Sequence, residues 1–103
     1  MAEFVKVAEL GDIPDGEGRA FAVRGAKIAI FNLDGELYAI DDTCTHDEAS
    51  LAEGWLEGDA VECPLHGAQF NVKTGEALSM PAVVGVNQYR LQIEGDEILI
   101  EVE

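Results

Sequence analysis

Apolar and polar residues alternate along both ends of the chain, which is the pattern of β-strands that bury one face. The alternating stretches are rich in β-branched and aromatic residues, and they cover residues 4–8, 19–23, 27–31, 36–40, 88–94 and 97–102. Turns with glycine, such as Asp34-Gly35 and Gly95-Asp96, separate them, because glycine permits the positive φ angle of tight hairpins. The pattern predicts an all-β fold of short antiparallel strands, either a β-sandwich or a partly open barrel.

Residues 41–87 interrupt this alternation. They hold two of the three prolines, both cysteines, both histidines and the single tryptophan. A helical pattern is limited to residues 48–53, which is too short for an independent helix. We therefore expect loops carried by the sheet, a common place for a functional site. A length of 103 residues fits one domain, residues 1–103, with the site in residues 41–87.

The charge of the chain narrows its partners. Asp and Glu number 21 against 6 Lys and Arg, which gives a formal net charge of -15. Nucleic acids and anionic membranes bind through clustered Lys and Arg, so neither is an expected partner. The chain starts without the apolar segment of a secretory signal, and no apolar run approaches the ~20 residues of a membrane span. We expect a soluble, cytoplasmic protein, and its charge favours a monomer.

Every cysteine and histidine of the chain lies in one of two short motifs, Cys44-Thr45-His46 and Cys63-Pro64-Leu65-His66. The cytosol keeps thiols reduced, so a disulfide is not expected, and the joint spacing argues against incidental core residues. Thiolates and imidazoles are metal ligands. Zinc sites of this ligand type usually take both cysteines from one segment, whereas a two-iron cluster can use a Cys and a His from each. The mixed motifs favour the cluster and leave structural zinc as the alternative.

The two motifs, with Gly67 after the second, resemble those of the Rieske ferredoxin family, and the resemblance extends over essentially the whole chain. It implies one [2Fe-2S] cluster per chain, with Cys44 and Cys63 on one iron and His46 and His66 on the other. It also implies a Rieske-like fold, in which a small cluster-binding subdomain of two loops is inserted between strands. A third loop, near residues 80–82 and containing Pro81, would cover the cluster.

The resemblance also bears on the reduction potential. High-potential members carry an extra cysteine in each loop and a Ser and a Tyr that donate hydrogen bonds to cluster sulfur. This chain lacks the cysteines and has Ala68 and Phe70 at the hydroxyl positions, while Asp47 and Glu48 add negative charge nearby. Gly67 would let the backbone approach the cluster. Without these donors the reduced state is less stabilised, so we expect a potential at the low end of the Rieske range, about -150 mV.

No nucleophile with a base and no nucleotide-binding glycine loop is present, so we expect no catalysis on this chain. The resemblance is strongest to the ferredoxin component of bacterial ring-hydroxylating dioxygenase systems of aromatic hydrocarbon catabolism. It implies a one-electron carrier between a flavin-dependent ferredoxin reductase and a terminal oxygenase, docking through its acidic surface and the exposed edges of His46 and His66. The alternatives are a small Rieske subunit of a nitrite-reductase-like complex and a zinc-binding module.

Two further expectations concern residues between the motifs. The large ring of Trp55 is expected to pack within the inter-loop segment. Gly54, Gly58 and Gly75 are expected to be turn residues.

Overall fold

The fold is almost entirely antiparallel β-structure, as the alternation predicts. The computed structural model describes residues 3–42, 50–64, 68–78 and 85–102. In these residues it contains ten strands and two short 3-10 helices: β1 (Glu3–Glu9), η1 (Leu10–Asp12), β2 (Gly18–Val23), β3 (Ala26–Leu33), β4 (Glu36–Asp41), η2 (Leu51–Glu53), β5 (Trp55–Glu57), β6 (Ala60–Glu62), β7 (Gln69–Asn71), β8 (Gln88–Tyr89), β9 (Leu91–Glu94) and β10 (Glu97–Val102). No helix in this part of the chain has the length and apolar character that crossing a bilayer requires.

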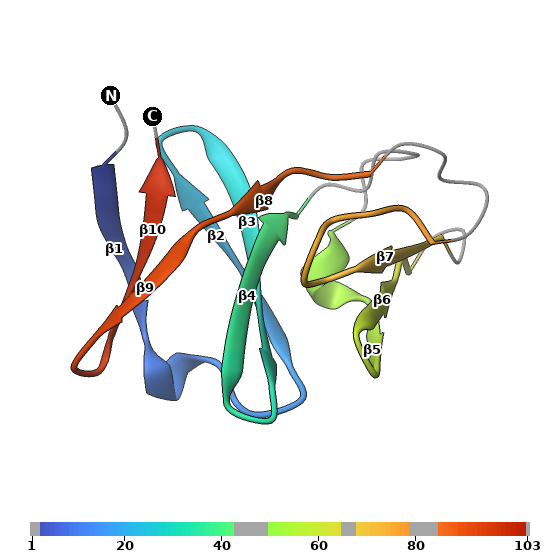
Figure 1. Cartoon of the computed structure of the whole chain (residues 1–103), viewed down its shortest axis with the longest axis horizontal. Coiled ribbons are helices and arrows are strands. Elements are labelled where there is room, and N and C mark those ends of the chain that lie inside the picture. The colour runs from blue at the N-terminus through green and yellow to red at the C-terminus, as the bar shows by residue number, and fades with distance from the viewer. Residues whose placement is uncertain (1–2, 43–49, 65–67, 79–84, 103) are drawn as a thin grey trace.

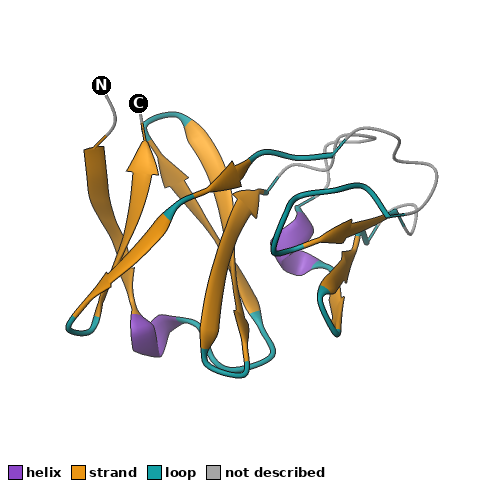
Figure 2. Cartoon of the chain, viewed as in Figure 1, coloured by secondary structure: helices purple, strands orange, loops and turns teal. Residues whose placement is uncertain are grey.

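The strands form three antiparallel sheets (Figures 1 and 2). Two larger sheets, with the strand orders β1-β10-β9 and β2-β3-β4-β8, are built from the two ends of the chain. The third, with the order β5-β6-β7, lies within residues 41–87 and stands to the right of the others in Figure 1. The antiparallel sheets do not close into a complete barrel, so the prediction of an all-β, partly open fold is confirmed.

Strand β3 supplies side chains to two separate cores, because residues 28–31 are fully buried on both faces of the strand. Ile28 and Ile30 pack with Ile98 and Ile100 of β10 in the core between the two larger sheets. Ala29 and Phe31 belong to the second core, under the small sheet. Successive side chains of a strand point to opposite faces, so the four-stranded sheet is the middle layer. The small sheet therefore packs directly against the four-stranded sheet.

The second core joins the small sheet to the middle layer. Its buried members are Ala29, Phe31, Ile40, Leu51, Val61, Cys63, Ala68, Phe70, Val72 and Val86. Predicted site residues Cys63 and Ala68 thus share one apolar cluster with strand residues of the main fold. This packing fixes the position of the chain around Cys63.

Candidate metal centre

Cys63 is the one predicted ligand within the described residues. Cys44 and His46 lie in residues 43–49, and His66 and Gly67 lie in residues 65–67, outside the described part, as does Pro81. Cys63 follows β6, is 1% exposed and carries a free thiol. Across the described ranges, no three His, Cys, Asp or Glu side chains gather as a metal site would require. The structural evidence for the centre therefore comes from Cys63 and from the residues that flank 43–49 and 65–67.

Cys63 and Ala68, which flank residues 64–67, are paired where β6 ends and β7 begins. The Cys63 amide donates a hydrogen bond to the Ala68 carbonyl oxygen at 2.7 Å, one step beyond the Glu62–Gln69 pair of β6 and β7. This bond holds Cys63 and Ala68 next to each other. Cys63 thus lies at the base of the segment that contains His66.

Asp42 holds together the two ends of the segment that contains Cys44 and His46. Its side chain is 3% exposed, and its Oδ1 atom accepts hydrogen bonds from the Ser50 hydroxyl at 2.8 Å and the Ala52 amide at 3.0 Å. The Asp42 carbonyl oxygen accepts a third, from the Leu51 amide at 2.7 Å. Sequence reasoning missed this role. A signal was present, because Asp42 and Ser50 are small polar residues on either side of the first motif.

Gly54 brings the bases of the two motif segments into contact. A Cβ atom at this position would lie 2.0 Å from the carbonyl oxygen of Glu62 and 3.2 Å from that of Leu51. Leu51 closes the first segment and Glu62 precedes Cys63, so the backbones on both sides meet at Gly54. Gly54 does lie at a bend between η2 and β5, but its φ of -80° is open to any residue, so close approach rather than a positive φ favours glycine here. The expectation of turn residues is confirmed for Gly58 and Gly75, at φ values of 60° and 82°.

Asp41 fixes the end of the third segment, which contains Pro81. Its amide donates to the Asn87 carbonyl oxygen at 2.9 Å, and its Oδ2 accepts from the Asn87 amide at 3.0 Å. The hydroxyl of Tyr89 donates to Asp41 Oδ1 at 2.5 Å. Burial and this hydrogen bond raise the pKa of Tyr89 to about 12. At the end of β4, Asp42 therefore holds the chain that follows the first motif, and Asp41 holds the chain that follows the third segment.

The side chains around Cys63 are apolar. Ala68 and Phe70 are both fully buried, and they share the second core with Val61 and Leu51. Neither side chain can donate a hydrogen bond to a group bound at Cys63. A buried thiol that has no disulfide partner, at a strand end with a closely approaching second segment, fits a sulfur ligand of a metal centre.

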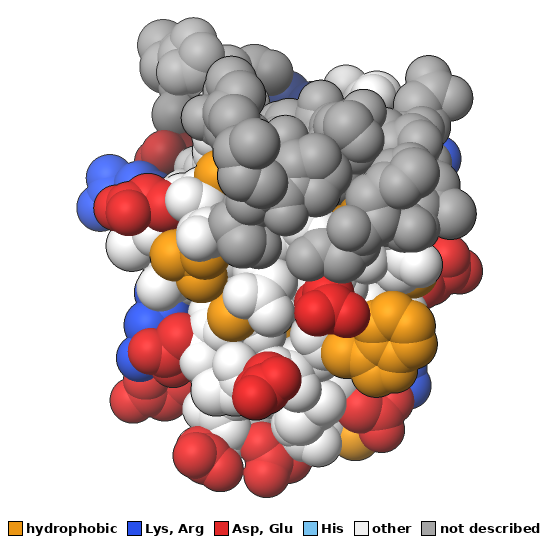
Figure 3. Space-filling view, turned by 90° about the vertical axis from the view of Figure 1, so that its right-hand side faces the viewer, with side chains coloured by type: hydrophobic (Ala, Val, Ile, Leu, Met, Phe, Trp, Pro, Cys, Tyr) orange, Lys and Arg blue, Asp and Glu red, His pale blue; other side chains and the backbone are white. Residues whose placement is uncertain are grey.

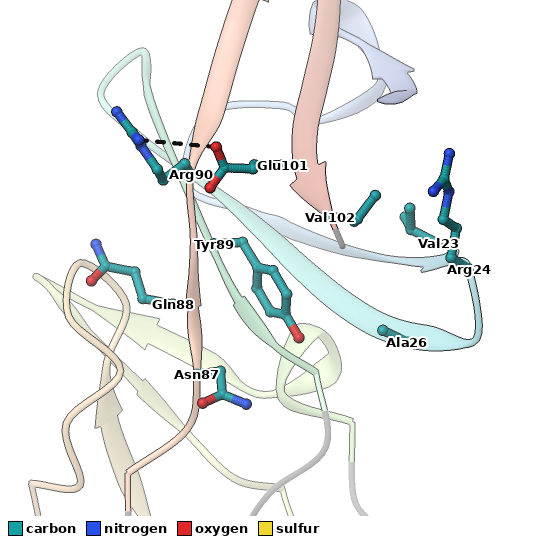
Figure 4. A pocket seen from close by; sticks show the side chains of 9 residues that line it. All are labelled: Val23, Arg24, Ala26, Asn87, Gln88, Tyr89, Arg90, Glu101 and Val102. Carbon is teal, nitrogen blue, oxygen red and sulfur yellow. Dashed lines mark ion pairs between the residues drawn. The ribbon is translucent and has the colours of Figure 1, made fainter. Parts of the chain in front are cut away.

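A hollow of about 390 Å³ opens beside Tyr89, between β8 and the β2–β3 turn (Figure 4). Two arginines line it, but Arg24 pairs with Glu3, and Arg90 Nη1 lies 3.9 Å from Glu101 Oε2. Its lining contains no cysteine or histidine. The hollow therefore offers no cysteine or histidine ligand, and both of its arginines are paired.

The curated protein named 3-phenylpropionate/cinnamic acid dioxygenase ferredoxin subunit, from Shigella flexneri, is 47% identical to this chain over 93 residues, which cover 89% of the chain and 87% of the relative. The solved structure of the Sphingomonas yanoikuyae B1 ferredoxin aligns with a TM-score of 0.92 at 30% identity, covering 98% of this chain and 100% of that one. A chain in a complex of reduced oxygenase and oxidized ferredoxin in carbazole 1,9a-dioxygenase aligns with a TM-score of 0.88 at 38% identity, covering 94% and 91%.

These comparisons distinguish between the three alternatives from the sequence: a dioxygenase ferredoxin, a nitrite-reductase-like subunit and a zinc-binding module. A nitrite reductase small subunit structure from Mycobacterium tuberculosis aligns with a TM-score of 0.88 but at 19% identity, which shows the shared fold alone. The more similar proteins are named as ferredoxins. The family model described as the Rieske [2Fe-2S] domain matches residues 3–90, which favours an iron–sulfur cluster over zinc. The chain belongs to the Rieske [2Fe-2S] domain family.

Proposed function

We propose that the chain is a one-electron carrier whose [2Fe-2S] cluster is bound by Cys44 and Cys63 through sulfur and by His46 and His66 through ring nitrogen. The observation that carries this assignment is the meeting of the two motif segments at Gly54, next to the buried thiol of Cys63. When bound, the cluster accepts and releases a single electron. The residues of the chain set its position and its potential.

Asp42 and Gly54 are the residues that position the ligand segments. The three hydrogen bonds to Asp42 fix the separation of Asp42 from Ser50–Ala52, and Gly54 lets the second segment lie directly against the first. Preorganised ligands lose less conformational freedom when a metal binds. These two residues therefore support the assignment of one centre shared by both motifs.

The surroundings of Cys63 support a low reduction potential. Ala68 and Phe70 offer no hydroxyl donor, and the chain carries a formal net charge of -15. Both features disfavour the addition of an electron relative to a site with donors and fewer carboxylates. We expect a potential of about -150 mV.

The physiological role that this supports is electron delivery from a flavin-dependent reductase to a terminal oxygenase that hydroxylates aromatic rings. The support comes from relatives named as dioxygenase ferredoxin subunits and from the similar chain in a complex of reduced oxygenase and oxidized ferredoxin. In such a system the oxygenase carries out the reaction and this chain carries the electron. We propose a soluble cytoplasmic monomer, because a net charge of -15 opposes self-association.

Single-turnover electron transfer tests this function. The dithionite-reduced chain, freed of excess reductant, is mixed without oxygen with the oxygenase components of the 3-phenylpropionate and carbazole systems. We expect the reduced chain to be oxidised by at least one of them, with one electron transferred per cluster. Oxidation by ferricyanide without oxidation by either oxygenase would contradict the proposed role while leaving the cluster intact.

A further inference from the structure

The small sheet arranges its side chains in two parallel rows, one buried and one exposed. The buried row consists of Leu56, Val61, Phe70 and Ala77, which are neighbours in register and all pack in the second core. Because adjacent residues of a strand face opposite sides, the next row lies on the outer face. This outer row consists of Trp55, Glu62, Gln69 and Leu78.

The register of the outer row follows from the strand pairs. Trp55 faces Glu62, and Glu62 faces Gln69. The Leu78 amide donates to the Gln69 carbonyl oxygen at 2.7 Å, which places Leu78 beyond Gln69. The Gln69 side-chain amide donates to Glu62 Oε1 at 3.4 Å. The row is therefore a continuous strip across the sheet, with a large apolar side chain at each end.

Both apolar ends of the strip are accessible to a partner. Trp55 is 63% exposed and Leu78 is 49% exposed. The expectation that Trp55 packs inside the inter-loop segment is therefore wrong: Leu56 supplies the packing, and Trp55 faces out. Scattered exposed apolar residues are common, but two on one strip beside a functional centre are typical of a binding surface. Tryptophan is the residue most enriched among those that dominate binding energy.

Carboxylates flank the Trp55 end of this strip and are not paired with Lys or Arg among the described residues. Glu53 and Glu57 are exposed on either side of Trp55, and Glu62 lies within the strip. Among the described residues, none of the three forms an ion pair with Lys or Arg. Figure 3 shows hydrophobic and acidic side chains together on this face of the molecule. The strip thus suits a partner whose apolar depression is rimmed by Lys or Arg.

The strip is also the part of the described surface next to Cys63. Glu62 directly precedes Cys63, and Gln69 directly follows Ala68, whose carbonyl oxygen accepts the Cys63 amide. One residue along a strand is about 3.3 Å. A protein seated on the outer row would therefore contact Glu62, the chain neighbour of Cys63, while the Cys63 side chain itself lies on the buried face.

We propose that the outer row is the docking surface for the electron acceptor, a terminal oxygenase whose apolar depressions receive Trp55 and Leu78. Basic residues of the oxygenase, at the rim of the depression that receives Trp55, face Glu53, Glu57 and Glu62. A second copy of the chain fits this surface less well, because a symmetric pair would place carboxylates against carboxylates. This inference rests on the proposed function and names the surface that performs it.

The test compares Trp55→Ala and Leu78→Ala with Phe4→Ala. Phe4 is an exposed aromatic residue on β1, in a sheet that does not include β5–β7, so it is a matched control. Oxidation of each reduced variant is followed with an oxygenase that oxidises the wild-type chain, and separately with ferricyanide, which needs no docking surface. The Kd for the oxygenase is measured by titration.

We expect Trp55→Ala to raise the Kd for the oxygenase by about tenfold or more, and Leu78→Ala by about three- to tenfold. The rates with ferricyanide and the behaviour of Phe4→Ala should match the wild type. Glu57→Gln should reduce the salt dependence of the rate with the oxygenase.

Three results would overturn the docking surface. The first is a Kd for Trp55→Ala within twofold of the wild type. The second is an equal loss of rate with ferricyanide, which would place the effect at the cluster. The third is a dimer, detected by sedimentation equilibrium, that Trp55→Ala dissociates. Failure of the wild-type chain to reduce any oxygenase is a distinct result. It contradicts the proposed function, and the docking proposal, which rests on that function, fails with it.

Discussion

Replacing Gly54 with alanine tests whether the two motif segments must touch. The added Cβ would lie 2.0 Å from the Glu62 carbonyl oxygen and 3.0 Å from its carbonyl carbon. Real Cβ atoms stay at least 3.0 Å from such neighbours, so the backbones must separate by about 1 Å (3.0 minus 2.0). Both neighbours are backbone atoms, so no side-chain rotation relieves the clash. Overpacking of this kind costs about 1–3 kcal/mol.

A loss of about 2 kcal/mol lowers the urea midpoint by about 1 M, because m is ~2 kcal/mol/M for a small domain. Unfolding is followed by far-ultraviolet circular dichroism, and iron per chain is assayed on the same samples. We expect Gly54→Ala to lose both stability and iron, because the shift separates the bases of the ligand segments.

Gly11→Ala is the matched control for this change. A Cβ at Gly11 would meet nothing within 4 Å, and its backbone does not lie in the left-handed region. We expect its urea midpoint and iron content to match the wild type. If Gly54→Ala also matches the wild type in both measurements, the argument for close approach at Gly54 is refuted.

Three further changes test other parts of the account. Asp42→Ala should cost about 1–3 kcal/mol and reduce iron content, because it leaves the Ser50 hydroxyl and the Ala52 amide without their acceptor; equal iron in Asp42→Ala and Asp42→Asn would argue against the anchoring role. The pKa of Tyr89 is raised to about 12 in the folded state, so its stabilising contribution is complete below pH 10 and is lost as the pH rises through about 12. Tyr89→Phe should flatten the fall in urea midpoint over that range, and an unchanged fall would contradict the assignment. Ala68→Ser should raise the reduction potential by about 60 mV, since a hydrogen bond to a charged group is worth ~1.5 kcal/mol and 59 mV is tenfold for one electron; a lower potential in a protein-film titration would be inconsistent with this.

The strands of the main fold could be predicted because their signal is long and repeated. Residues 97–102 alternate and follow the Gly95-Asp96 turn, and they form β10, Glu97–Val102, with Ile98, Ile100 and Val102 buried. The small sheet was not predicted, because β5, β6 and β7 are only three residues each. Three residues carry too little periodicity to distinguish a strand from a loop. Their pairing is decided by packing in the second core.

In the candidate site, too, the sequence predicts the ligand residues but not the residues that position them. The chemistry of Cys44, His46, Cys63 and His66 is evident from residue type and spacing, without any structure. The roles of Asp42 and Gly54 depend on contacts with Ser50, Ala52, Leu51 and Glu62, made through the fold.

The outward orientation of Trp55 could not be predicted for a similar reason. It is decided by Leu56, whose side chain packs in the second core and turns its neighbour to the outer face. Hydrophobicity alone gives no indication of which of these adjacent residues is buried.

Electron paramagnetic resonance of the dithionite-reduced protein, with iron and acid-labile sulfide assayed on the same sample, tests the central claim most directly. The account predicts two irons and two sulfides per chain, and a rhombic signal with an average g value clearly below that of all-cysteine two-iron clusters. Nitrogen hyperfine coupling in the same signal would report the bound histidines. A silent sample with stoichiometric zinc and no sulfide would contradict the electron-carrier account.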